Sequence, residues 1–86
     1  MKLRDGLILR QVAGEYVVVS VGVEVDLNGL ITLNDTACTM WRRLERGAEL
    51  PELTEALLEE YDVDEQTAAA AAARFVDKLK ELDLLA

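Results

Sequence analysis

The chain has 86 residues, of which 51% are hydrophobic and 30% are charged, a balance that predicts one small globular domain over residues 1–86 and excludes intrinsic disorder. No apolar run approaches the roughly 18 residues that a membrane span needs, so we expect no membrane partner. The formal net charge of −8 lies entirely in residues 45–86, which hold twelve acidic and four basic residues. We therefore expect no nucleic-acid partner, because affinity for DNA or RNA comes largely from Lys and Arg that neutralise phosphates.

The first third of the chain predicts three antiparallel strands. Runs rich in β-branched residues at Leu7–Val12 and at 16–21 flank an Ala-Gly turn at 13–14, which favours a hairpin. The second run is apolar on both faces, as in a central strand. An Asn-Gly dipeptide at 28–29 is a strong turn signal, and we expect a third strand at residues 30–33 on the sheet edge. A separate small hairpin about this dipeptide is the alternative.

The remainder of the chain predicts three helices. Asn34 is a good cap for the first helix, which carries Trp41 on its inner face and ends at Gly47. Pro51 suits the first position of the second helix, and Asp64 can cap the third. The predicted inner stripe of the third helix consists of Ala68, Ala72, Phe75, Leu79 and Leu82. Strands followed by helices predict an α+β domain with the helices packed on one sheet face.

No group of side chains predicts catalysis, a metal site or a cofactor. The chain has no histidine, so Cys38 lacks an imidazole to activate it, and we expect a small buried hydrophobe there. A lone cysteine is also compatible with the reducing cytoplasm. The acidic segment 62–65 lacks the ligand spacing of an EF-hand, so it predicts a helix cap and a solvated surface. We expect the small basic cluster at 42–46 to pair with nearby carboxylates.

Two features predict binding to another chain. Residues 30–33 carry none of the charges or prolines that usually protect an exposed strand edge, so either a helix covers this edge or it accepts a partner strand. A second copy of the chain could pair there too, so a homodimer through this edge is an alternative. The six alanines at 68–73 have two interpretations, namely helix propensity and a shallow trough in which another chain can settle.

The segment at 27–37, followed by Trp41 and by the later pattern of Tyr61, Phe75 and Leu79, resembles the PqqD-like family. These small peptide chaperones are named after protein D of pyrroloquinoline-quinone biosynthesis, and the resemblance covers nearly the whole chain. It implies a winged-helix-like fold of three strands and three helices. It also implies a non-enzymatic recognition element that binds the leader of a ribosomally made precursor peptide and presents it to a modifying enzyme, such as a radical-SAM protein or a lasso-peptide leader protease.

In this family the leader adds to the third strand and lies in a cleft against the third helix. Carried over to this chain, the peptide-binding residues are Leu30, Ile31, Thr32, Leu33, Ala69, Ala72, Ala73, Val76 and Lys80. The opposite flank of the helix, with Ala71, Arg74 and Lys78, stays open as the alternative. Where relatives often carry an Asp-Val pair, this chain has Ala71-Ala72, which implies a wider or more apolar cleft.

Two other functions are compatible with such a fold. A winged-helix DNA-binding protein is one, although the net charge of −8 and the lack of a basic helix face disfavour it. A structural adaptor that dimerises through the same strand edge is the other. An enzyme has the least support, because no catalytic group is present.

Overall fold

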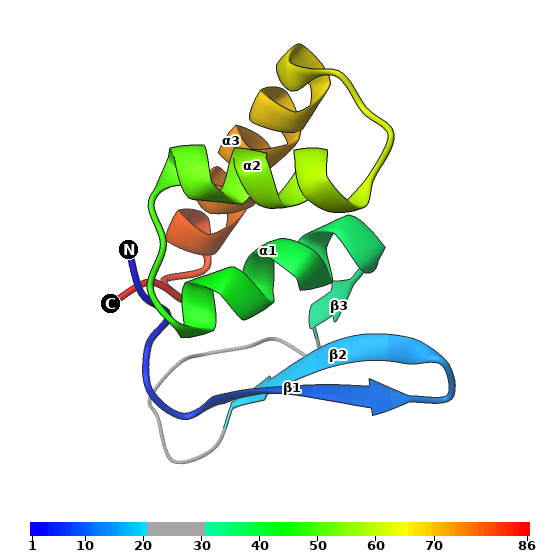
Figure 1. Ribbon diagram of the computed structural model, residues 1–86. Helices are drawn as coiled ribbons and strands as arrows, with labels where there is room; N and C mark the ends of the chain where they lie inside the picture. Colours follow the sequence, from blue (N-terminus) through cyan, green and yellow to red (C-terminus); the bar gives the residue numbers. More distant parts are fainter. Residues whose placement is uncertain (21–30) are drawn as a thin grey trace.

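The computed structural model describes residues 1–20 and 31–86, and these residues form three strands followed by three helices (Figure 1). The elements are β1 (Leu7–Val12), β2 (Glu15–Ser20), β3 (Ile31–Leu33), α1 (Asp35–Glu45), α2 (Leu50–Glu60) and α3 (Glu65–Glu81). The sheet is antiparallel with the order β1-β2-β3, and the helices gather on one side of it. The predicted α+β architecture is confirmed, with the second strand central and the third at an edge. The expected turn at 28–29 lies outside the described residues.

The β1–β2 hairpin has the tight turn that its sequence predicts. Ala13 and Gly14 have φ angles of 51° and 82°, which is the left-handed conformation that both central residues of a type I′ turn require. The turn brings Val12 opposite Glu15 and fixes the register of the whole hairpin. Glycine adopts this conformation without strain, which explains why the chain reverses at this point.

The core lies between the inner face of the sheet and the three helices. Its largest fully buried side chains are Val18, Trp41, Leu44, Leu53, Leu57, Leu79 and Leu84. Cys38 is 4% exposed and belongs to the same cluster, as predicted for a small hydrophobe. Because Trp41 comes from α1 and Val18 from β2, the core joins the sheet and the helices into one unit.

The helix caps are largely those expected. The Oδ1 atom of Asn34 accepts a hydrogen bond from the Ala37 N–H at 2.9 Å, and α1 begins at the next residue after this cap. An Oδ1 atom of Asp64 accepts from the Thr67 N–H at 2.7 Å at the start of α3. These short side chains satisfy N–H groups that the first turn of a helix leaves unbonded.

The start of α2 differs from the prediction by one residue. The helix begins at Leu50, so Pro51 occupies the second position and its expected place at the first was wrong. Glu49 and Glu52 form a capping box, in which the Glu52 carboxylate accepts from the Glu49 N–H at 3.0 Å. Proline is tolerated at both positions, because neither N–H in the first turn has a partner within the helix.

The rotation of α3 about its axis also departs from the expectation. Ala68, Ala72, Val76 and Leu79 are buried, whereas Phe75 and Leu82 are only partly buried and pack against the edge of the core. The predicted stripe is confirmed at Ala68, Ala72 and Leu79 and only in part at Phe75 and Leu82. Val76, which was not expected in that stripe, is buried as well. A stripe through Ala68, Ala72 and Val76 follows the i, i+4 spacing of a helix.

Within the two described segments, no helix is long and apolar enough to cross a membrane.

Candidate functional site

The candidate site begins at the edge of the sheet formed by β3. This strand pairs with β2 alone, and no other described strand lies along its second edge. In the register of the pair, Tyr16 is opposite Leu33 and Val17 is opposite Thr32. The short strand then continues directly into the Asn34 cap of α1, so the helix holds the end of the strand in place.

The hairpin register determines which backbone groups of β3 face outward. A two-residue hairpin turn is closed by a hydrogen-bonded pair, which is Val12 with Glu15. Hydrogen-bonded and non-bonded pairs alternate along antiparallel strands, so Glu15 bonds to β1 and Tyr16 bonds to β3. Leu33, opposite Tyr16, therefore uses its backbone groups on β2. The N–H and C=O of Thr32 point the other way, toward the free edge.

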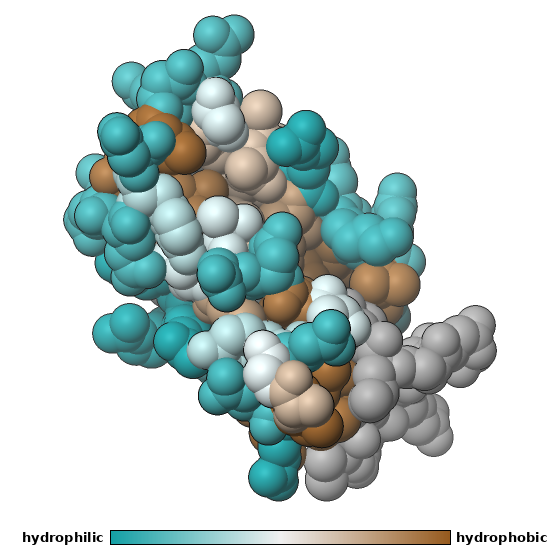
Figure 2. Space-filling view, turned by 90° about the vertical axis from the view of Figure 1, so that its right-hand side faces the viewer, coloured by the Kyte–Doolittle hydropathy of each residue, from teal (hydrophilic) through white to brown (hydrophobic). Residues whose placement is uncertain are grey.

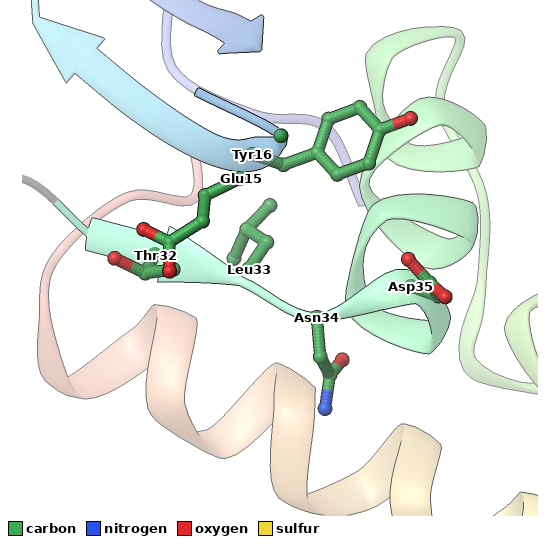
Figure 3. Close-up of a pocket in the computed structure, with 7 residues that line it drawn as sticks. Glu15, Tyr16, Thr32, Leu33, Asn34 and Asp35 are labelled. Atoms are coloured by element: carbon green, nitrogen blue, oxygen red, sulfur yellow. The ribbon is translucent and has the colours of Figure 1, made fainter. Parts of the chain in front are cut away.

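A hollow of about 500 Å³ lies at the end of this edge (Figure 3). It is lined by Gly14, Glu15, Tyr16, Thr32, Leu33, Asn34 and Asp35. In Figure 3 the Glu15 side chain reaches toward the side of β3 that carries Thr32, while the Tyr16 ring lies toward α1. The Asn34 amide points toward α3, although its Oδ1 atom is already occupied by the cap. The hollow is thus polar at the rim and continuous with the strand edge.

The helix α3 runs past β3 in the opposite direction (Figure 3). One flank of this helix carries Ala71, Phe75 and Leu82, which are partly buried against the core. The opposite flank carries Ala69 and Lys80, which are exposed. The flank of Phe75 therefore presents apolar side chains that pack against the core and still reach the solvent.

The space-filling view agrees with this description. Figure 2 shows tan and brown side chains in a band that descends over α3 toward the sheet, with hydrophilic side chains on both sides. The alanines of α3 that contribute partly buried or exposed surface are Ala69, Ala70, Ala71 and Ala73. These alanines lie on several sides of the helix and leave small apolar surfaces open to the solvent.

The structure distributes the predicted site residues unevenly. Thr32 lies at the free edge, Leu33 is buried, and the backbone of Ile31 pairs with β2 opposite Val18. Leu30 lies outside the described residues. On α3, Ala72 is 0% and Val76 is 5% exposed, so neither side chain offers free surface. The side chains of Ala69 and Lys80 are exposed and that of Ala73 is partly buried.

Other residues at the hollow were not predicted from the sequence. Glu15, Tyr16, Asn34 and Asp35 line it because the start of β2 lies beside the end of β3. The hairpin turn indicates the register of β2 against β1, whereas the register of β2 against β3 has no such local signal. A capping Asn directly after an edge strand was the available indication that this end of the strand meets a helix.

A group of polar contacts braces the opposite side of Tyr16. The Arg42 guanidinium lies 5.6 Å from the centre of the Tyr16 ring, in a cation–π arrangement that joins α1 to β2. The Thr39 hydroxyl and the Tyr61 hydroxyl share a hydrogen bond of 3.0 Å, which joins α1 to the end of α2. Arg43 pairs with Glu59 at 3.2 Å, so one member of the basic cluster pairs with a carboxylate as expected. These contacts link α1 to β2 and to α2 beside the hollow.

Two titratable side chains of the described residues have shifted pKa values, and each shift has a structural cause. Burial raises the pKa of the Cys38 thiol, and the positive charge of Arg42 opposes this only in part, so the thiol is a poor nucleophile. Asp64 is engaged as a helix cap, which lowers the pKa of its carboxyl. Across residues 1–20 and 31–86, no three acidic or cysteine side chains are grouped as a metal site would require.

Comparison with known proteins places this geometry in a family. Residues 15–85 match the family described as "Coenzyme PQQ synthesis protein D (PqqD)". A solved structure of "TbiB1 in Complex with the TbiA(beta) Leader Peptide" is 25% identical with a TM-score of 0.78, and covers 99% of this chain and 94% of that chain. A second, "Lasso peptide synthetase B1 complexed with the leader peptide", is 29% identical with a TM-score of 0.72, and covers 93% of this chain and 89% of that chain. No curated protein sequence matches the chain.

Proposed function

Because the chain belongs to the PqqD family, we propose that it is a non-enzymatic module that binds the leader region of a ribosomally synthesised precursor peptide. The leader adds as a strand to β3 and is delivered to a modifying enzyme. The observation that carries this proposal is the free edge of β3 in a chain whose two similar solved structures are both titled as complexes with leader peptides.

Strand addition matches the geometry of the edge. The outward N–H and C=O of Thr32 can form a hydrogen-bonded pair with one residue of the leader. Neighbouring leader residues then turn their side chains to the opposite face, because side chains alternate along a strand. Leu33 belongs to the core-facing side of β3, so the leader residue beside it also faces the helices. We therefore expect apolar leader residues two positions apart, directed toward α3.

The α3 side of the cleft is proposed to be the flank of Ala71, Phe75 and Leu82. These side chains are partly buried beside the core and supply apolar contact surface. This flank replaces that of Ala69 and Lys80, whose side chains are exposed. A small side chain at Ala71 leaves room for a large apolar residue of the leader.

The remaining partners are proposed from the same family membership. We propose that residues 1–86 act as one recognition domain in the cytoplasm, where ribosomal peptides are made. The modifying enzyme is proposed to be a leader protease, since one similar structure is named a lasso peptide synthetase, with a radical-SAM enzyme as the other candidate.

Two copies are also proposed to pair through β3 when no leader occupies that edge. Light scattering with and without leader tests this pairing.

Fluorescence anisotropy tests the proposed function. The labelled peptide is the leader encoded by the short open reading frame nearest the gene, and a scrambled peptide and a duplex DNA oligomer serve as controls. We expect saturable binding of the leader alone. Binding of DNA without binding of the leader, or equal binding of the scrambled peptide, would contradict the proposal.

A further inference from the structure

The basic residues of α3 are set apart from the acidic half of the chain. Arg74, Lys78 and Lys80 are three of only four basic residues in segment 45–86, which holds twelve acidic residues. All three side chains are exposed. Among the described residues, the ion pairs involve Met1, Arg4 and Arg43 and none of the α3 cations. Within residues 1–20 and 31–86, no acidic side chain pairs with any of these three cations.

Two of these cations border the proposed groove and the third does not. At 100° per residue, Lys78 lies about 20° from Ala71 and about 40° from Leu82 around the helix axis. Arg74 lies one turn earlier and about 40° farther out than Lys78. Lys80 lies about 160° from Lys78, on the opposite flank. Arg74 and Lys78 thus form a positive rim along the apolar flank, which we call the α3 basic rim.

The structure points to the chemical class of the leader. Building on the function proposed above, we propose that the bound leader carries an acidic side chain that meets the α3 basic rim of Arg74 and Lys78. Lysine and arginine can lay their methylene stems along an apolar wall while the charged ends face the solvent, so partly buried Phe75 and Leu82 suit them as neighbours. The pair then attracts a carboxylate at the edge of the proposed groove.

The charge of the rest of the domain makes this contact selective. The chain carries −8 overall, so an acidic leader is repelled by most of the surface of residues 45–86. The α3 basic rim is an exception to that repulsion, whereas an acidic leader residue placed elsewhere against segment 45–86 would meet mainly like charge. Attraction by the α3 basic rim and repulsion by the acidic surface around it together determine where an acidic leader residue binds.

The spacing of the groove also places the acidic residue in the leader sequence. Successive residues on one face of a strand are about 6.6 Å apart, and Phe75 and Lys78 are about 4.5 Å apart along the helix axis. A strand that runs along α3 and places an apolar side chain beside Phe75 therefore brings its next α3-facing residue within about 2 Å of the level of Lys78, a gap that the long lysine side chain can span. We expect the leader to contain an apolar residue followed or preceded two positions away by Asp or Glu.

Charge reversal tests the proposal with a control on the same helix. The proteins are Lys78→Glu, Arg74→Glu and, as the matched control, Lys80→Glu, which makes the same change of charge on the opposite flank. The probes are the labelled leader from the nearest short reading frame and the same leader with its acidic residues replaced by amides. For the native leader we expect each rim reversal to weaken binding by about fivefold, with little change for Lys80→Glu. The difference should shrink at high salt, where charges are screened.

The outcomes separate this inference from the proposed function. If the wild type binds the leader and all three reversals leave affinity unchanged, the acidic contact is wrong while leader binding stands. If all three reversals weaken binding equally, the net charge of the protein alone explains the loss, which overturns the proposal. A larger loss of affinity for Lys80→Glu would place the leader on the opposite flank and would overturn it too. Tight binding of the amide peptide overturns it as well. If the wild type binds no leader at all, the proposed function itself fails.

Discussion

Thr32 of β3 lies directly opposite Val17 of β2 in a pair whose backbone groups do not bond to each other. The N–H and C=O of Thr32 are consequently directed to the free edge of the sheet, whereas the neighbouring Leu33 is bonded to β2. This alternation separates the residues of β3 into two roles. Leu33 holds the strand in the sheet, and Thr32 is the described residue of β3 best placed to pair with an added strand.

Enlarging Ala71 should narrow the groove. We expect Ala71→Leu to weaken leader binding by about tenfold, because added methyl groups occupy space that an apolar leader side chain needs. Ala69→Leu makes the same change on the exposed flank and should leave the affinity unchanged. Alanine and leucine are both strong helix formers, so both variants should fold, which circular dichroism can verify. Equal affinities for the two variants would place the leader away from Ala71.

The Cys38 thiol should contribute a pH-dependent part of the stability. Burial raises its pKa above the ordinary value of 9.0, so the folded protein holds the thiol proton more tightly than the unfolded chain. The contribution is therefore fully present below pH 9.0 and is lost as the pH rises through the higher pKa of the folded state. We expect the stability advantage of the wild type over Cys38→Ala to narrow above this pH in urea unfolding. A constant difference across that range would contradict the assignment.

Trp41 should be the most sensitive position of the core. It is 0% exposed, and within residues 1–20 and 31–86 no hydrogen-bond acceptor meets its indole Nε1. We expect Trp41→Ala to cost about 3–5 kcal/mol of unfolding free energy, because it leaves a large cavity. Trp41→Phe should cost clearly less, since it keeps much of the packing and removes an N–H that has no partner. Urea unfolding followed by circular dichroism measures both, and equal losses would contradict this account.

The parts of the fold that the sequence predicts well rest on local chemistry. Turn residues 13–14 indicate the hairpin, and Asn34 and Asp64 mark helix starts, because each acts within a few residues of itself. The apolar character of both faces of β2 predicted its central place. The capping box of Glu49 and Glu52 was missed because Pro51 is compatible with two positions of the first turn.

The candidate site was harder to predict, because its residues come together through tertiary packing. Six alanines at 68–73 differ in nothing but position, so they carry no signal for the rotation of α3 about its axis. Val76 was expected at the cleft, but packing buries it in the core, whereas the larger Phe75 is only partly buried. The register of β2 with β3 likewise depends on contacts between distant segments, so the hollow beside Tyr16 could not be predicted.

The central claim is that a leader strand pairs with the outward backbone of Thr32, and a pair of proline variants tests it most directly. Proline at Thr32 removes the N–H that faces the free edge, while Gln11→Pro removes an equivalent outward N–H on β1, the opposite edge of the sheet. Circular dichroism first confirms that each variant is folded. We then expect leader affinity, measured by fluorescence anisotropy, to fall by at least about tenfold for Thr32→Pro and to stay unchanged for Gln11→Pro. Undiminished affinity in a folded Thr32→Pro protein would contradict strand addition at β3.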